Sequence, residues 1–213
     1  MAKDKLTPAE MRQMLMHVCQ GMVASKDLLT EADRAIGDGD HGIGMARGFE
    51  AVRRQLEAGQ FAGIDELWRL VGQTLMAAVG GASGAVFGTL FRGGAKGLSG
   101  LQSLGSAELS VLLLQGLSAV QERGKARLGD KTMVDALEPA ARCAAELAAL
   151  PLAEALPQIA AAARAGADRT RDLIAQVGKA KTLYERSLGH PDPGAVSMAL
   201  ILQLMAEWVG AAQ

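Results

Sequence analysis

The sequence predicts an all-α protein, a single-domain barrel or bundle of about eight antiparallel, up-and-down helices. Hydrophobic residues make up 49% of the chain but aromatic residues only 3%, a composition typical of helix packing and not of a β-sandwich. Nearly every segment between turn signals repeats apolar residues at helical spacing, and none alternates as a strand would. The predicted helices are of similar length and have short connections, which favours antiparallel neighbours.

The first helix begins with a clear start signal. In Thr7-Pro8-Ala9-Glu10, Thr7 and Glu10 have the spacing of a capping box, and Pro8 occupies the first turn, where its missing amide costs nothing. One apolar stripe then follows helical spacing: Met11, Met14, Leu15, Val18 and Met22.

The remaining helices follow from the same periodicity. The second is defined by an apolar stripe and closed by Gly59; the stripe consists of Met45, Phe49, Val52 and Leu56. Six further helices are predicted over residues 64–79, 82–98, 107–123, 132–150, 152–177 and 195–210.

Length and charge restrict the domain count and the classes of partner. With 213 residues, we expect one domain spanning residues 1–213. The 22 Lys and Arg residues balance 23 Asp and Glu residues, so the chain lacks the basic excess of nucleic-acid-binding proteins.

Because we find no signal sequence and no run of about 18 apolar residues, we expect a cytoplasmic protein that does not enter a membrane. Cys19 and Cys143 stand apart from any Cys/His cluster, which predicts free thiols.

Four connections differ from the others because they combine glycine with polar residues: residues 33–44, 80–84, 124–130 and 189–194. In an up-and-down order they follow helices one, three, five and seven, so all four fall at one end of the bundle. Glycine-rich polar loops gathered at one end of a helical scaffold are typical of a binding site.

The first of these loops contains Gly37, Gly39 and Gly42 at the spacing of the dinucleotide fingerprint. That interpretation fails because the fingerprint follows a strand, whereas a helix precedes this loop. An EF-hand fails as well, because with Asp38 at position one, Phe49 stands where the bidentate Glu is required.

The same loop brings three aspartates, Asp33, Asp38 and Asp40, within eight residues. Hard carboxylate oxygens suit Mg²⁺, which binds one or two carboxylates together with phosphate oxygens. Three carboxylates and a bound diphosphate would carry a charge of about −6, which two divalent ions would largely offset. The alternative is that Asp38 and Asp40 only turn the chain and cap the next helix. His41 either donates to a phosphate oxygen or fixes the loop, and with three histidines in the chain we do not expect a zinc site.

The other three loops supply small and basic residues. In Gly80-Gly81-Ala82-Ser83-Gly84, a phosphate can approach the start of the next helix; the alternative is a glycine C-cap followed by a serine N-cap. The third loop brings three cations and Met133, which could pack on a purine; the cations are Lys125, Arg127 and Lys131. The turn at residues 189–194 either shapes a ribose or base pocket or only separates two helices. Together the loops predict a site for Mg²⁺ and a nucleotide at one end of the bundle.

Four motifs together resemble the nucleotide-binding subunit L of dihydroxyacetone kinases. They are Ile36-Gly-Asp-Gly-Asp-His-Gly42, Gly80-Gly-Ala-Ser-Gly84, Gly129-Asp-Lys-Thr-Met133 and Glu185-Arg-Ser-Leu-Gly-His-Pro-Asp-Pro-Gly-Ala195. The resemblance runs from about residue 8 to the C-terminus and implies an eight-helix antiparallel barrel with the nucleotide at one end.

The resemblance implies a role for each loop. Asp33, Asp38 and Asp40 would hold two Mg²⁺ ions that bridge the phosphates of ADP or ATP. The residues implied to line the nucleotide are His41, Gly42, Ile43, Gly44, Ala82, Ser83, Gly124, Met133, Lys179, Asp192, Pro193 and Gly194. Lys179 stands where relatives carry Arg, and Gly44 where they often carry Asn. No general base is assigned.

The resemblance also implies partners. A separate subunit K would hold dihydroxyacetone covalently through a histidine, so this chain would act as a kinase only with that partner. Either ADP stays bound as a coenzyme recharged by a phosphotransferase-system subunit M, or the chain exchanges ADP for free ATP. In the second case the substrate could be a tetrulose such as erythrulose. A regulatory or lipid-binding helical module is the alternative from another class, and a homodimer is left open.

Overall fold

The structure, a computed structural model, describes residues 4–98 and 100–211. In that part of the chain nearly all regular structure is helical, and an isolated bridge between Leu6 and Leu104 is the one β interaction. The α-helices are α1 (Pro8–Ala24), α2 (Lys26–Arg34), α3 (His41–Ala58), α4 (Ile64–Ala78), α5 (Gly81–Gly94), α6 (Ser106–Gly124), α7 (Val134–Glu146), α8 (Leu152–Arg169) and α9 (Pro193–Ala211). Three 3₁₀ segments are η1 (Ala95–Gly97), η2 (Thr170–Asp172) and η3 (Lys179–Ser187).

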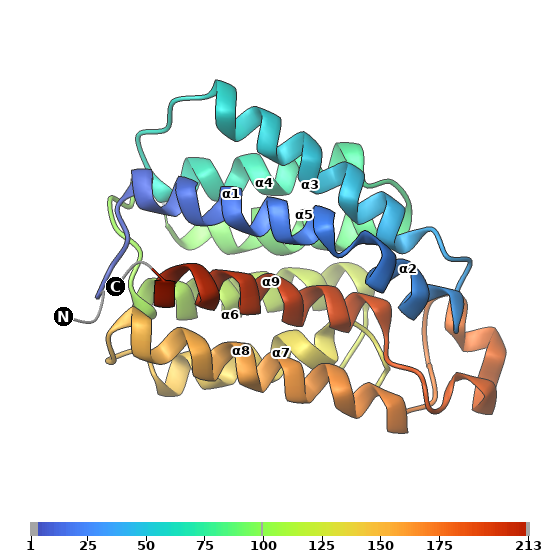
Figure 1. The fold of residues 1–213 in the computed structure, drawn as a ribbon. Helices are drawn as coiled ribbons and strands as arrows, with labels where there is room; N and C mark the ends of the chain where they lie inside the picture. The colour runs from blue at the N-terminus through green and yellow to red at the C-terminus, as the bar shows by residue number, and fades with distance from the viewer. Residues whose placement is uncertain (1–3, 99, 212–213) are drawn as a thin grey trace.

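The long helices form a closed antiparallel barrel. From α3 to α9 each helix packs against the next along the chain, and α9 and α3 both pack against α1, which closes the ring (Figure 1). The interior is one hydrophobic cluster that includes the predicted stripe of the first helix. The all-α fold with antiparallel neighbours is therefore confirmed. The capping box between Thr7 and Glu10 is also present.

The first predicted helix is divided in two. Ser25 leaves the helical region (φ −89°, ψ 12°), and α2 begins directly after it. As a result, Asp33 belongs to the last turn of α2, and the acidic loop is shorter than the sequence suggested.

The helix predicted over residues 152–177 is wrong beyond Arg169, where α8 ends. The Thr170 hydroxyl donates to the Ala167 carbonyl oxygen (2.5 Å) and accepts from the Asp192 amide (2.8 Å), which fixes the end of α8 against the start of α9. The intervening segment, which includes η2 and η3, forms irregular structure at one end of the barrel (Figure 1).

Helix α9 corrects a second expectation. Its length and apolar composition would allow it to cross a membrane, a property that we did not expect from the sequence. It packs against α8, α1 and α7, and half of its apolar stretch is buried inside the protein. Core helices of globular proteins share these properties.

The expectation that the four glycine-bearing loops lie at one end of the bundle is confirmed. The α2–α3, α4–α5, α6–α7 and α8–α9 connections lie at the same end of the barrel, the right-hand end in Figure 1.

Candidate functional site

A cavity of about 560 Å³ opens at this end of the barrel, and all four glycine-bearing connections contribute to its wall. This volume lies within the usual range for pockets that bind small molecules. The wall includes every residue expected from the sequence except Gly42: Asp33, Asp38, Asp40, His41, Ile43, Gly44, Ala82, Ser83, Gly124, Met133, Lys179, Asp192, Pro193 and Gly194. Gly42 instead packs against α2, where a Cβ would lie 2.2 Å from the Lys26 carbonyl oxygen.

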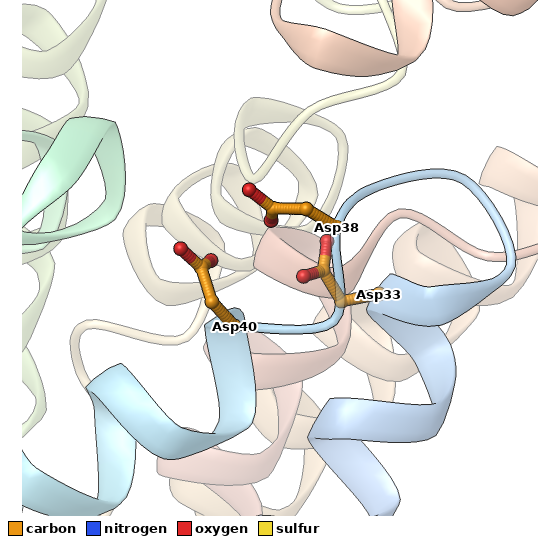
Figure 2. Close-up of side chains that lie close together, drawn as sticks. All are labelled: Asp33, Asp38 and Asp40. Atoms are coloured by element: carbon orange, nitrogen blue, oxygen red, sulfur yellow. The ribbon is translucent and has the colours of Figure 1, made fainter.

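The three aspartates meet at one side of the cavity. Asp33 comes from the last turn of α2, Asp38 from the loop, and Asp40 directly precedes α3. One carboxylate oxygen of each lies within 4.8 Å of the others, and Figure 2 shows the three carboxylates turned toward a common space. Asp33 is only 7% exposed, whereas Asp38 and Asp40 are open to solvent.

The loop folds tightly around Asp33. The Asp33 carbonyl oxygen accepts from the amides of Ile36 (3.0 Å) and Gly37 (2.5 Å), and its carboxylate accepts from the His41 amide (3.1 Å). A Cβ on Gly37 would lie 2.1 Å from Asp33 Oδ1, so any larger residue there would have to displace the Asp33 carboxylate. Gly39 has a φ of +78°, which glycine adopts without strain.

The hydrogen bonds of these carboxylates bear on the two interpretations of the loop, a cation site or a turn that caps the next helix. The Asp40 side chain makes no capping hydrogen bond to α3, and the His41 amide is satisfied by Asp33. The Asp38 carboxylate bonds Lys179, on a distant segment of the chain. The geometry therefore does not support the capping part of the alternative, and it leaves Asp40 and the exposed Asp38–Lys179 ion pair accessible to a cation.

Lys179 places a positive charge among the aspartates. Its ammonium donates to Asp38 Oδ2, and it lies 3.9 Å from Asp40 Oδ2. The bond from Lys179 lowers the pKa of Asp38. Partial desolvation and the neighbouring Asp38 carboxyl raise the pKa of Asp40. A set of only carboxylate oxygens, crowded enough to repel one another, fits Mg²⁺ better than a softer metal.

His41 ties three helices together. Its Nδ1 lies 3.0 Å from Ser83 Oγ and its Nε2 lies 2.7 Å from Ser197 Oγ. Burial lowers the pKa of His41, so the ring is neutral, donates from one nitrogen and accepts at the other. Of the two roles considered for His41, the geometry favours fixing the loops. Ser83 lies in the first turn of α5 without capping it, so the serine N-cap alternative is wrong.

The start of α5 forms the wall beside His41. Gly80 (φ +81°) and Gly81 (φ +56°) both have positive φ values. Beyond the adjacent backbone of its own helix turn, no atom of the described residues lies within 4 Å of a Cβ built on Gly81. Gly81, Ala82 and Ser83 line the cavity, and the first amides of a helix lack intrahelical partners, so this helix start favours an anion. Gly44 faces the same wall, and a Cβ there would lie 3.1 Å from the Val79 carbonyl oxygen.

The opposite wall is built from the loop before α7. The Asp135 carboxylate accepts from the amides of Gly129 (2.6 Å) and Thr132 (2.7 Å) and so fixes the loop. Lys131 is buried and donates to the carbonyl oxygens of Thr170 and His190. Burial lowers the pKa of Lys131. This lysine therefore fastens the loop to the α8–α9 connection.

Asp192 begins α9. Its carboxylate accepts from the Ala195 amide (2.7 Å), which caps the helix, and Pro193 follows in the first turn. Removal of this carboxyl from water raises the pKa of Asp192 to about 7. Gly194 lies close to Met133, since a Cβ on Gly194 would be 3.4 Å from Met133 Cβ.

Two polar residues that contribute to this site were not expected from the sequence. Arg47 lines the cavity from the second turn of α3, and the fully buried Ser197 bonds His41. Both carry a signal in the sequence. Arg47 follows Gly44 by three residues on the same helix face, and Ser197 is a polar residue in an otherwise apolar stretch of helix.

The chain is similar to known kinase proteins. The DAK2 domain model matches residues 35–207. The chain is 40% identical over 182 residues to the ADP-binding subunit DhaL of the PEP-dependent dihydroxyacetone kinase of Escherichia coli, with 84% of this chain and 87% of that subunit aligned. A DhaL subunit from Listeria innocua is 37% identical over 183 residues, with 86% and 87% aligned.

Longer proteins match over part of their length. The L-erythrulose kinase of Pectobacterium atrosepticum is 34% identical over 195 residues, which is 32% of that protein. The crystal structure of the dihydroxyacetone kinase of C. freundii in complex with AMP-PNP and Mg²⁺ superposes with a TM-score of 0.74 at 29% identity, covering 96% of this chain and 35% of that one. The chain thus spans about a third of these two proteins but nearly the full length of the DhaL subunits. On the family model and on these identities, the chain belongs to the DAK2 domain family.

Proposed function

We propose that this chain is the nucleotide-binding, phosphoryl-transfer subunit of a dihydroxyacetone kinase, and that it binds ADP or ATP with Mg²⁺ in the cavity at the end of the barrel. The observation that carries this proposal is the convergence of three carboxylates beside a helix start in a cavity walled by all four glycine-bearing loops. Positioning and charge neutralisation are the main contributions a protein makes to phosphoryl transfer, and this cavity offers both.

Asp33, Asp38 and Asp40 would hold the metal, as two Mg²⁺ ions. The ions would neutralise charge on the nucleotide phosphates. The chain's own residues supply the rest: the amides at the start of α5 bind phosphate oxygens, and His41 holds that helix start against α3 through Ser83. Met133 and Gly194 lie together on the other side, where an apolar wall suits the purine. Ile43, Gly124 and Lys179 also line the cavity wall, and we include them among the residues that contact the nucleotide.

The acceptor would be a ketose held by a partner subunit K, which would meet the open end of the cavity. The match over nearly the full length of DhaL subunits favours a separate, cytoplasmic, single-domain subunit with ADP as a bound coenzyme recharged by subunit M. A second candidate is an ATP-dependent kinase for dihydroxyacetone or a tetrulose, which the similarity to an L-erythrulose kinase favours.

The proposal is tested by calorimetric binding of ADP with and without Mg²⁺. We expect the wild type to bind ADP only with the ion, and Asp38→Asn to lose that binding while retaining its helical circular dichroism. Asp27→Asn is the matched control, since Asp27 lies on α2 with a 94% exposed side chain away from the cavity wall. Equal Mg²⁺-dependent binding by wild type and Asp38→Asn would contradict the metal assignment.

A further inference from the structure

Arg47 projects from α3 into the wall of the cavity. It follows His41 by six residues, which places it about 9 Å farther along the helix axis. The acidic cluster therefore lies at one end of this stretch of α3 and Arg47 at the other. Gly44 lies between them and has no side chain to fill the intervening space.

The guanidinium of Arg47 is held in a fixed place. Its Nε donates to the Ala78 carbonyl oxygen (2.7 Å), and its Nη2 donates to the Val79 carbonyl oxygen (2.6 Å). These carbonyls belong to the last residues at the C-terminal end of α4. A Cβ on Gly80 would lie 3.4 Å from Nη2, so the guanidinium also borders the glycine turn that starts α5.

The charge of Arg47 has no acidic partner in the described part of the chain. Both of its hydrogen-bond acceptors are neutral carbonyls, and among residues 4–98 and 100–211 it forms no ion pair. The other cations on the cavity wall differ: Lys179 is bonded to Asp38, and Lys131 is buried on two carbonyls near Asp192. In the described part of the chain no hydrogen bond engages Arg47 Nη1, so this group and the positive charge are available to a ligand.

We propose that Arg47 binds the terminal phosphate of the nucleotide and so makes this site sensitive to the number of phosphates. This inference rests on the proposed function. In the ring of helices, the loop before α7 with Met133 lies across from α3, so a nucleoside on that wall directs its phosphates toward α3 and α5. On this proposal, the terminal phosphate of ADP or ATP reaches Arg47, whereas the single phosphate of AMP is too short to do so. An arginine held by two of its nitrogens is preorganised for such a contact.

The test compares dissociation constants for AMP, ADP and AMP-PNP in the presence of Mg²⁺. We expect Arg47→Met to weaken ADP and AMP-PNP about tenfold or more, because a charge-assisted hydrogen bond is lost. AMP binding should change by less than about twofold. Arg47→Lys keeps the charge but loses the planar guanidinium, so it should weaken ADP and AMP-PNP less than Arg47→Met does and still leave AMP nearly unchanged. If Arg47→Met does not fold, Arg47→Lys provides the test.

Arg53→Met is the matched control, since Arg53 lies on the same helix but pairs with Glu50 and Glu57 away from the cavity. It should bind all three nucleotides as the wild type does. If the Arg47 variants weaken AMP, ADP and AMP-PNP equally, Arg47 only supports the turn and the inference is overturned. Unchanged affinities overturn it as well. A wild type that binds none of the three contradicts the proposed function itself, which separates the two failures.

Discussion

Lys179 and Asp38, 141 residues apart in the sequence, form an ion pair in the middle of the acidic cluster, where Lys179 also lies 3.9 Å from Asp40. The ammonium therefore occupies the space between two carboxylates that a divalent cation would need. Both side chains of the pair are at least half exposed, so the pair contributes little to stability and separates easily. A residue expected to contact phosphate is thus paired with the acidic cluster in this structure, and we predict that Mg²⁺ displaces it.

Lys179→Met should raise the affinity for Mg²⁺ in the absence of nucleotide. The ion would no longer compete with the ammonium, and an exposed pair of this kind corresponds to a gain of about two- to fivefold. Calorimetric titration with MgCl₂ measures this, and Lys181→Met controls for the change in net charge, since Lys181 is exposed on the same segment. Mg²⁺ affinity that is unchanged or reduced relative to the control would show that Lys179 does not occupy the cation site.

Gly37→Ala should disable the metal site without unfolding the barrel. The new methyl group would lie 2.1 Å from Asp33 Oδ1 and must displace that carboxylate. We expect Mg²⁺ affinity to fall about 10- to 100-fold, as for loss of other groups that orient metal ligands. Gly210→Ala is the control, because a Cβ there meets no atom within 4 Å among residues 4–98 and 100–211 outside its own turn of α9. Wild-type Mg²⁺ affinity in Gly37→Ala, measured by the same titration, would argue against Asp33 as a ligand.

Ser197→Ala should destabilise the protein by about 1–3 kcal/mol, because it removes the buried hydrogen bond between Ser197 Oγ and His41 Nε2. The free energy of unfolding in urea is the measurement. Ser106→Ala is the matched control: Ser106 is also buried, but its hydroxyl has no hydrogen-bond partner in the described part of the chain, so its removal should cost little. Equal effects of the two substitutions would mean that the His41–Ser197 bond adds no stability.

Asp192 should make stability depend on pH. Its pKa is about 7 in the folded protein, above the value of about 3.9 in an unfolded chain. Between these values the folded state holds a proton that the unfolded state has released, so this group favours folding at low pH and loses that effect as pH rises toward 7. The slope is at most about 1.4 kcal/mol per pH unit.

Asp192→Asn removes this titration. The difference in unfolding free energy between wild type and Asp192→Asn, measured in urea from pH 4.5 to 8, should therefore shift in favour of the variant up to about pH 7 and level off above it. A difference that stays constant over that range would contradict the raised pKa of Asp192.

Local signals in the sequence predicted the parts of the protein that local physics determines. Apolar periodicity and capping residues located the helices, and the glycine-rich connections placed the acidic loop and the start of α5 at one end. The break at Ser25 was missed because no proline or glycine marks it and the apolar stripe continues up to Met22.

Contacts between distant segments could not be predicted in this way. The bonds from Lys179 to Asp38, from Ser197 to His41 and from Arg47 to the end of α4 join residues 31 to 156 positions apart. Their partners are decided by how the barrel closes, which residue spacing alone does not reveal. The segment after α8 was misjudged for the same reason, because the bond between Thr170 and Asp192 ends the helix there.

The most direct test of the central claim is nucleotide content and exchange. The purified chain would be analysed for retained nucleotide, and its replacement by labelled ATP would be followed with Mg²⁺ and then with EDTA. We predict that nucleotide is held in the presence of Mg²⁺ and released on chelation; slow exchange would mark ADP as a coenzyme, and fast exchange would mark a direct ATP-dependent subunit. Absence of nucleotide binding under both conditions, or retention that EDTA does not affect, would contradict the assignment of this cavity as a Mg²⁺-nucleotide site.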